Sequence, residues 1–189
     1  MKKPKRGQCR IIAGKWRGRK ISFNDAEGLR PTTDRIRETV FNWLQPYIQK
    51  SHCLDAFAGS GVLGFEALSR GAENVVFIEK TIETVKRLKE NVTQLDVKSA
   101  SIYHADTLNW LRSQSIHERF DLVFLDPPFH SDLLSKTSVL LNSSGCLTED
   151  AIIYVEHAVD TDIVLPESWL CKKEKCAGQV VYKIFERQL

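Results

Sequence analysis

A short apolar strand that runs into a glycine-rich turn, and from there into a helix, is the feature that most restricts the fold of this chain. The segment is Leu54-Asp55-Ala56-Phe57-Ala58-Gly59-Ser60-Gly61, followed by a helical stretch from Val62 to Arg70 with Gly71 as its expected C-cap. Gly59 and Gly61 let the backbone turn sharply and approach a ligand closely, and free N–H groups are expected to begin the helix facing that ligand. The pattern predicts a nucleotide-type loop in an α/β fold.

Strands and helices continue to alternate after this loop. A strand from Asn74 to Ile78 ends in Glu79, where a carboxylate can accept hydrogen bonds from both hydroxyls of a ribose. The next helix is expected from about Thr81 to Leu95, with Ile82, Val85, Leu88, Val92 and Leu95 facing inward. Further strands are expected at Ser101 to Ala105, Phe120 to Leu125, Ala151 to Glu156, Leu170 to Glu174 and Val180 to Phe185, with a helix around Leu133 to Leu141 and a hairpin turn at Ala177-Gly178.

Asp106 follows the third of these strands and has two possible uses. Its place at a strand end favours a cofactor contact, in which its carboxylate accepts from an adenine amino group. The same residue precedes a helix that carries Leu108 and Leu111, so it can equally serve as the N-cap of that helix. The sequence leaves both uses open.

The stretch Asp126-Pro127-Pro128-Phe129 directly follows the apolar run Leu122 to Leu125. Ligands in open α/β sheets lie beyond the carboxyl ends of strands, which is where this turn falls. Two prolines fix φ and remove two backbone N–H groups, leaving a stiff turn whose carbonyls can point at a substrate. Asp126 offers an acceptor and Phe129 a stacking face, which together suit a flat ring bearing an amino group. A capped turn that ends a strand is the structural alternative.

An exocyclic amine on an aromatic base is a poor nucleophile, because its lone pair is delocalised into the ring. A catalyst must therefore hold the amine in line and accept its hydrogen bonds, which Asp126 and the Pro127 carbonyl are placed to do. The turn therefore points to a methyltransferase that acts on a nucleobase nitrogen. Either guanine or adenine would satisfy it, so an adenine-N6 methyltransferase of DNA or RNA remains an alternative.

The glycine loop fits two different cofactors. Gly59-x-Gly61-x-x-Gly64, with Glu79 about 20 residues further on, also matches the dinucleotide fingerprint, so an NAD-dependent oxidoreductase is not excluded by spacing. Asp55 favours S-adenosylmethionine, because a carboxylate suits the ammonium of that cofactor and not a pyrophosphate. The candidate cofactor-binding residues are Asp55, Phe57, Gly59, Gly61, Glu79 and Asp106.

Basic residues are concentrated at the N-terminus. The first 20 residues hold nine Lys or Arg and no acid, and the remaining residues carry 18 basic against 24 acidic side chains. Such a segment can bind a polyanion on an otherwise acidic protein, and Trp16 adds a stacking group. Ile11, Ile12, Trp16 and Ile21 indicate a short β-ribbon packed on the domain with its arginines outward. The candidate RNA-binding residues are Arg10, Lys15, Arg17, Arg19, Lys20, Arg30, Arg35 and Arg37.

An amphipathic helix is expected after Pro31-Thr32-Thr33-Asp34, which is typical helix-starting sequence. Apolar residues recur at intervals of three and four, namely Ile36, Val40, Trp43, Leu44, Tyr47 and Ile48. Pro46 is expected to kink or end this helix near Gln45. Periodicity favours a core position for Trp43, and Arg35 and Arg37 can equally form ordinary ion pairs on the helix surface.

Length and composition indicate one globular domain, with residues 1–8 as a flexible basic tail, 9–50 as an RNA-binding ribbon and helix, and 51–189 as the catalytic core. No apolar run is long enough to cross a bilayer and no signal-peptide core is present, so a cytoplasmic protein without a membrane partner is expected. The five cysteines have no CxxC pairs and no zinc spacing, so we expect reduced thiols and no metal.

The chain resembles the bacterial family of small-subunit ribosomal RNA guanine-N2 methyltransferases. The resemblance runs nearly end to end, through the stretches 10–20, 29–38 and 54–61, then Asp126 to Phe129, and finally Ala177-Gly178-Gln179-Val180. His130 departs from the arginine expected after the phenylalanine, which weakens any phosphate contact there.

The resemblance implies a class I, Rossmann-like methyltransferase fold, with a mostly parallel seven-stranded sheet whose last strand is antiparallel. It also implies the use of S-adenosylmethionine to methylate N2 of one guanine in 16S rRNA, within a small-subunit particle or an assembly intermediate. In that reaction the guanine leaves its stack, Phe129 covers its face, and Asp126 with the Pro127 carbonyl accepts from N2. A noncatalytic ribosome-assembly binder is a third possibility, alongside the adenine-N6 and NAD alternatives.

Overall fold

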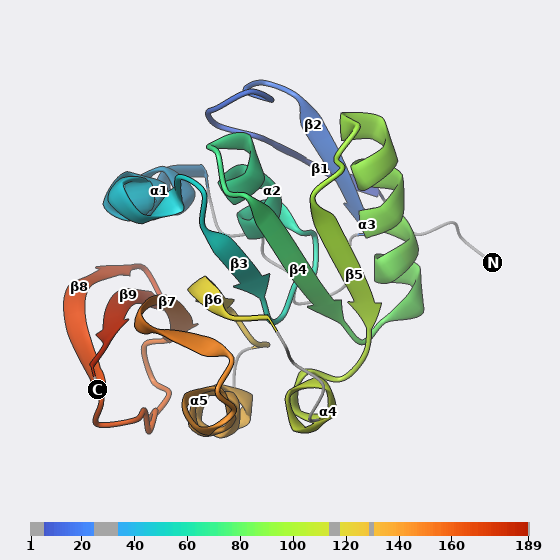
Figure 1. Ribbon diagram of the computed structural model, residues 1–189. Helices are drawn as coiled ribbons and strands as arrows, with labels where there is room; N and C mark the ends of the chain where they lie inside the picture. The colour runs from blue at the N-terminus through green and yellow to red at the C-terminus, as the bar shows by residue number, and fades with distance from the viewer. Residues whose placement is uncertain (1–5, 25–33, 114–117, 129–130, 189) are drawn as a thin grey trace.

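A seven-stranded sheet forms the centre of the protein. The computed structural model describes residues 6–24, 34–113, 118–128 and 131–188 (Figure 1). The strands run in the order β5-β4-β3-β6-β7-β9-β8. Their bounds are β3 His52–Asp55, β4 Asn74–Glu79, β5 Ala100–His104, β6 Phe120–Leu125, β7 Leu147–Ala158, β8 Trp169–Ala177 and β9 Val180–Arg187.

Strand directions agree with the expected sheet. Neighbouring strands from β5 through β7 pair in parallel, whereas β9 lies antiparallel between β7 and β8. The last strand in the chain is thus the antiparallel one, as predicted. The turn that joins β8 to β9 spans Gly178 and Gln179, which confirms the expected hairpin.

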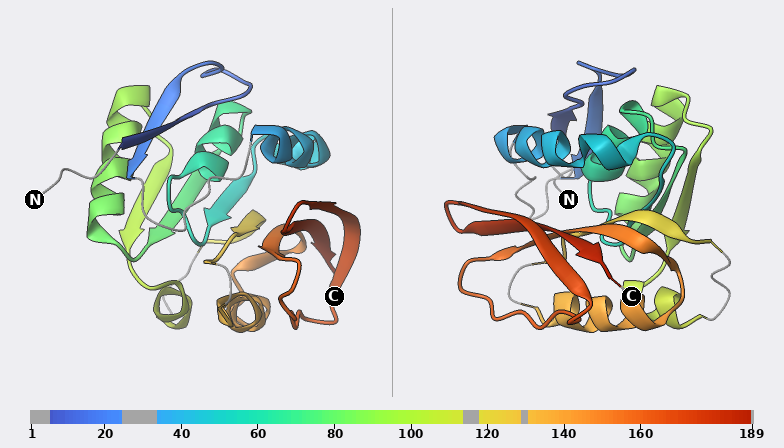
Figure 2. Two further views of the ribbon diagram at one scale, coloured as in Figure 1. Left: turned by 180° about the vertical axis from the view of Figure 1, so that it is seen from behind. Right: turned by 60° about the vertical axis from the view of Figure 1, so that its left-hand side comes forward.

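Helices cover both faces of this sheet (Figures 1 and 2). One face carries α1 Asp34–Ile48, α2 Val62–Ser69 and α3 Ile82–Leu95, together with an N-terminal ribbon of β1 Arg6–Arg10 and β2 Lys20–Asn24. The other face carries α4 Thr107–Arg112 and α5 Leu133–Ser143. Two buried apolar clusters fill the spaces between these layers and the sheet. Packing on both faces of the sheet therefore fixes the positions of the strand ends.

The ribbon is part of the folded structure and begins earlier than the sequence suggested. β1 starts at Arg6, inside the segment expected to be a flexible tail. Ile11, Trp16 and Ile21 are buried, so the expected packing of the ribbon on the domain is confirmed. Asn91 of α3 pairs with the backbone of Ser22, accepting its N–H at 3.0 Å and donating to its carbonyl at 2.9 Å. The Asn91 side chain therefore satisfies both backbone polar groups of Ser22 on β2.

Helix α1 continues through Pro46 to Ile48, so the expectation that it could end near Gln45 was wrong, whereas a kink at Pro46 stays a prediction. A proline inside a helix deprives the carbonyl four residues earlier of its N–H partner. Here both Asn42 and Pro46 are exposed, so water can solvate that carbonyl. Pro31, Thr32 and Thr33, the expected helix start, lie outside the described residues.

Two side chains assigned to apolar stripes face outward. Tyr47 is 41% exposed and Ile82 is 40% exposed, although both match the helical periodicity. Each occupies an end of its helix, Tyr47 in the last turn of α1 and Ile82 at the first position of α3. Trp43 is half-buried against Tyr182, with ring centroids 5.5 Å apart, in keeping with its expected packing role.

Candidate active site

Three acidic residues meet at the carboxyl edge of the sheet. Asp55 ends β3, Glu79 ends β4, and Asp126 directly follows β6, and these strands are neighbours in the sheet. Asp55 is in register with both Phe77 of β4 and Phe124 of β6. The structure thus brings the predicted cofactor and catalytic carboxylates to one edge, as the strand-end argument expected.

Glu79 holds the glycine loop in place. Its two carboxylate oxygens accept from the N–H of Gly59 at 3.0 Å and from the N–H of Thr81 at 2.7 Å. Gly59 and Gly61 have φ values of 49° and 76°, in the left-handed region that glycine enters at little cost. Each carboxylate oxygen has a second lone pair, so Glu79 can still accept from a ligand.

Asp55 is turned toward the start of α2. It is 3% exposed, and its Oδ2 accepts from the N–H of Gly64 at 3.2 Å. The N–H of Val62 reaches the hydroxyl of Ser60 at 3.4 Å. The expectation that α2 begins with free N–H groups was therefore wrong for Val62 and Gly64, because the side chains of Ser60 and Asp55 accept from them.

Burial raises the pKa of Asp55 to about 7. The hydrogen bond from Gly64 partly offsets this effect, and the nearby charge of Glu79 adds to it. A carboxylate without a compensating cation is costly to bury. The electrostatics at this position therefore favour a positively charged ligand group and oppose a phosphate.

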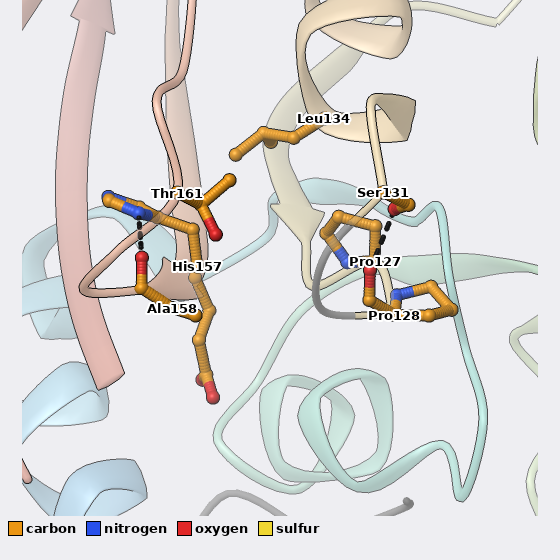
Figure 3. A pocket seen from close by; sticks show the side chains of 8 residues that line it. Pro127, Pro128, Ser131, Leu134, His157, Ala158 and Thr161 are labelled. Carbon is orange, nitrogen blue, oxygen red and sulfur yellow. Dashed lines mark hydrogen bonds between the residues drawn. The ribbon is translucent and has the colours of Figure 1, made fainter. Parts of the chain in front are cut away.

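The turn after β6 is only partly as expected. Asp126 is half-buried and Pro127 is buried, whereas Pro128 is exposed. The Pro128 carbonyl accepts from the Ser131 hydroxyl at 2.7 Å, a local hydrogen bond that was not expected (Figure 3). A serine three residues on supplies the donor that the prolines lack. Phe129 and His130 lie outside the described residues.

Burial also raises the pKa of Asp126 well above its usual range, and Glu156 and Asp55 raise it further. Glu156, near the end of β7, is 3% exposed, and its Oε2 accepts from the Tyr154 hydroxyl at 2.6 Å. The sequence reasoning missed both residues. The signal was present, because Glu156 ends the apolar run Ala151 to Val155 as Glu79 ends its own strand.

A pocket opens between the turn after β6 and the end of β7 (Figure 3). It is half-open to solvent and is lined by Pro127, Pro128, Ser131, Leu134, Glu156, His157, Ala158 and Thr161. In Figure 3 the two prolines lie across the pocket from His157 and Thr161, with Leu134 between the two sides. Pro127, the residue that follows Asp126, and Glu156 both line this pocket.

The remaining cofactor candidates lie close to this edge. Asp106 is the N-cap of α4 and accepts from the N–H of Asn109 at 3.1 Å, so the capping use is confirmed. Asp106 is exposed, and its carboxylate can accept a further hydrogen bond. Phe57, in the glycine loop, is half-buried against the apolar cluster on the α4 and α5 face.

The basic candidates of the ribbon lie at the opposite edge of the sheet. The N–H of Lys15 donates to the carbonyl of Ser69, at the end of α2, at 2.8 Å. Because α2 runs back from the carboxyl edge, this contact places the loop between β1 and β2 toward the amino ends of the strands (Figure 1). The exposed basic candidates are Arg10, Lys15, Arg17, Arg19, Lys20 and Arg35.

Three expectations for this region need correction or fall outside the structure. Arg37 is fully buried, and its Nη2 donates to the carbonyl of Arg10 at 3.0 Å and to Asp34 at 2.5 Å, so it is not a surface contact. Trp16 is also buried, with the Lys15 ammonium 4.1 Å from its ring centroid, and offers no open stacking face. Arg30 lies outside the described residues.

Neither a metal centre nor a membrane span is found in the described part of the chain. Among these residues, no group of three or more His, Cys, Asp or Glu side chains is arranged to hold a metal ion. In that same part of the chain no helix is long and apolar enough to cross a membrane.

Comparisons with known proteins agree with this geometry. A ribosomal RNA small subunit methyltransferase D from Haemophilus influenzae is 47% identical over 183 residues, covering 96% of this chain and 95% of the relative. The protein of that description from Escherichia coli K12 is 44% identical over 192 residues, covering 100% and 96%.

Solved structures show the same fold. One from Escherichia coli is 42% identical and has a TM-score of 0.89, covering 96% of this chain and 99% of that one. A ribosomal protein L11 methylase from Lactobacillus delbrueckii, at 18% identity, has a TM-score of 0.65 over 82% of this chain and 80% of that one. At that identity the likeness concerns the fold alone, which is the class I methyltransferase fold.

The sequence also matches the family described as Conserved hypothetical protein 95 over residues 9–186. That match includes most of the ribbon, the glycine loop, the Asp126 turn and nearly all of the final hairpin. The chain therefore belongs to this family, together with the curated ribosomal RNA small subunit methyltransferases D.

Proposed function

We propose that this chain transfers a methyl group from S-adenosylmethionine to the exocyclic N2 of a guanine in small-subunit ribosomal RNA. One observation carries the proposal above the others. Asp126 and Pro127 stand at the carboxyl end of β6, beside Asp55 and Glu79, in a chain related end to end to ribosomal RNA methyltransferases. The site thus combines an amine acceptor with a place for a cationic cofactor.

The residues present fit S-adenosylmethionine, which would supply the methyl group. Within the described residues, no cationic side chain is among the groups that shift the pKa of Asp55, which is raised by burial and by Glu79. An ammonium group would supply the missing positive charge. Glu79 would hold the ribose hydroxyls, and Gly59 and Gly61 would let the backbone approach the cofactor. Asp106 and Phe57 are proposed to contact its adenine side.

The same charges argue against a dinucleotide. In the Rossmann arrangement a pyrophosphate lies at the N-terminus of the helix after the glycine loop. Here the Asp55 carboxylate already accepts from Gly64 at that position. A second anion would lie against a buried carboxylate, so NAD is disfavoured by the charge of the site as well as by the family.

Asp126 would position the guanine amine together with the Pro127 carbonyl. When these two groups accept the N2 hydrogens, the amine lone pair turns out of conjugation and points at the methyl donor. Most of the acceleration would arise from this alignment. Because its pKa is raised, the Asp126 carboxylate can also take the proton that the methylated nitrogen loses. Phe129 would stack on the base.

A large folded RNA can contact both edges of the protein. The exposed arginines and lysines of the ribbon lie at the amino edge, away from the pocket, so they would bind RNA segments distant from the target base. Such reach suits ribosomal RNA within a small-subunit particle or an assembly intermediate better than a short oligonucleotide. The polyanion contact would be sensitive to salt.

The test is to offer labelled S-adenosylmethionine with naked 16S rRNA, an assembly intermediate or a complete small subunit, and to identify the product nucleoside by mass spectrometry. N2-methylguanosine at one position is expected. Asp126→Ala should abolish transfer while cofactor affinity stays near wild type, and Asp150→Ala, at an exposed position, should change neither. Methylated adenine, no RNA label, or full activity of Asp126→Ala would contradict the proposal.

A further inference from the structure

We infer that Glu156 is a specificity-determining residue, which selects guanine over other amino-bearing purines by accepting the hydrogen of guanine N1. This inference rests on the function proposed above and adds the reason why the substrate is guanine. Glu156 lies near the end of β7 and lines the pocket beside Pro127.

The register of the sheet places Glu156 next to Asp126. Leu125 of β6 pairs with Val155 of β7, so Asp126 and Glu156 are the next residues along two parallel neighbouring strands. Adjacent strands lie about 4.8 Å apart, within reach of two converging carboxylates. Phe124 and Tyr154, two residues earlier, are also paired, and their ring centroids lie 6.2 Å apart in an edge-to-face arrangement. Glu156 is, after burial, the next cause of the raised pKa of Asp126, in keeping with this register.

Glu156 is held in a fixed orientation. Its Oε2 accepts from the hydroxyl of Tyr154 at 2.6 Å, and Tyr154 is fully buried with its ring edge against Phe124. A carboxylate buried this deeply at the border of a pocket is costly unless hydrogen bonds compensate it. A carboxylate can accept about four hydrogen bonds, so accepting one from Tyr154 does not prevent Glu156 from also accepting one from a ligand.

Two adjacent acceptors match one purine edge. The Watson–Crick edge of guanine carries N1–H and the N2 amine side by side, which are donors that Asp126 and Glu156 can accept together. In adenine, N1 is an acceptor beside the N6 amine, so its lone pair would face the Glu156 carboxylate. A site built to accept from a substrate N–H rejects an analogue lacking it by up to about 10⁴-fold. The pair therefore explains guanine selection by the Asp126 turn, which alone would accept any purine amine.

The experiment varies the target base and the carboxylate together. Target RNA, in the particle that supports wild-type activity, is prepared with guanine, 2-aminopurine or 2,6-diaminopurine at the methylated position. All three carry the 2-amino group, but only guanine carries N1–H. Wild-type protein should prefer guanine by at least about 100-fold in kcat/KM.

Glu156→Gln should lose about 100-fold on guanine and reduce the preference over 2-aminopurine to less than about 10-fold, because the amide can turn its NH₂ toward the purine N1. Tyr154→Phe should shift the preference in the same direction by a smaller factor, since it removes only the group that orients Glu156. The matched control is Glu149→Gln, on β7 at an exposed position, which should behave as wild type.

Circular dichroism and cofactor titration establish that each variant is folded and binds S-adenosylmethionine as wild type does. Unchanged discrimination in Glu156→Gln, or an equal loss on all three bases, would overturn the inference while leaving the proposed function in place. If the proposed function itself is wrong, wild-type protein will form no N2-methylguanosine on any RNA. That result differs from the two outcomes above, and it would overturn the inference as well.

Discussion

The carboxylate of Glu66 accepts the backbone N–H of Ile12 at 2.8 Å, joining the interior of α2 to the ribbon. The N–H of Ala13 reaches the other oxygen at 3.0 Å, and Arg70 donates to it at 2.7 Å. Glu66 itself is fully buried, and its three donors are partly buried. One carboxylate on a core helix therefore holds the basic ribbon on the methyltransferase domain.

Replacing Glu66 by alanine is expected to lower the free energy of unfolding by about 3 kcal/mol. The change leaves two partly buried N–H groups and the Arg70 guanidinium without their acceptor. Denaturant titration measures the loss, and hydrogen exchange at Ile12 and Ala13 should accelerate more than exchange in β4. Glu73→Ala, at an exposed position, is the control and should change stability by less than about 0.5 kcal/mol. Equal stability of the two variants would show that Glu66 does not anchor the ribbon.

Local patterns were sufficient to predict the individual strands and the polar residues at their carboxyl ends, whereas the seven-stranded sheet with an antiparallel last strand came from the family resemblance. Runs such as Leu122 to Leu125 are continuous and apolar because parallel strands are covered on both faces, and the polar residue after each run marks the strand end. The sequence alone therefore assigns Asp55, Glu79 and Asp126 to one edge.

Features that depend on strand order or on distant contacts could not be predicted in this way. The proximity of Glu156 to Asp126 requires β7 to lie beside β6, which no local pattern specifies. Arg37 resembles a surface residue in its own helix, yet the ribbon folds over it and supplies the Arg10 carbonyl. Pro128 seemed free because the donor to its carbonyl, Ser131, lies beyond the motif.

Asp55 should make stability depend on pH. Its folded-state pKa of about 7 lies above the usual value of about 4, so the folded protein binds this proton more tightly than the unfolded chain. The resulting stabilisation is complete below about pH 4 and is lost as pH rises to about 7. Without cofactor, Asp55→Asn should therefore gain about 3 kcal/mol relative to wild type between pH 5 and pH 8. Urea titrations at both pH values measure this gain, and a constant difference would contradict the raised pKa.

Gly64 is expected to tolerate no side chain. A Cβ at this position would lie 2.3 Å from Cε1 of Phe77 and 2.9 Å from Cγ1 of Val75, where α2 packs on β4. Gly64→Ala should cost about 3 kcal/mol by forcing the helix away from the sheet. Gly145→Ala is the comparison, because its φ of 74° is strained but no atom lies within 4 Å, and it should cost about 1 kcal/mol. Combining Gly64→Ala with Phe77→Leu should recover about 1 kcal/mol relative to additivity, and strict additivity would argue against this clash.

Arg35 and Arg37 are expected to separate RNA binding from stability, although they are two residues apart on one helix. Arg35 is exposed, so Arg35→Ala should leave the free energy of unfolding within about 0.5 kcal/mol of wild type. If Arg35 contacts a phosphate, the slope of log affinity against log salt should fall by about 1. Arg17→Ala, in the ribbon, should show the same reduction.

Arg37→Ala should instead destabilise the protein by about 2 kcal/mol, because it removes a buried guanidinium that binds the Arg10 carbonyl and Asp34. Its salt slope should equal that of wild type when measured by fluorescence anisotropy at a temperature where circular dichroism shows the variant folded. A slope lowered as much as in Arg35→Ala would mean that Arg37 leaves its buried position to contact RNA. An unchanged salt slope with reduced stability would show that Arg37 attaches the ribbon to the domain. The RNA contact would then belong to the exposed arginines Arg17 and Arg35.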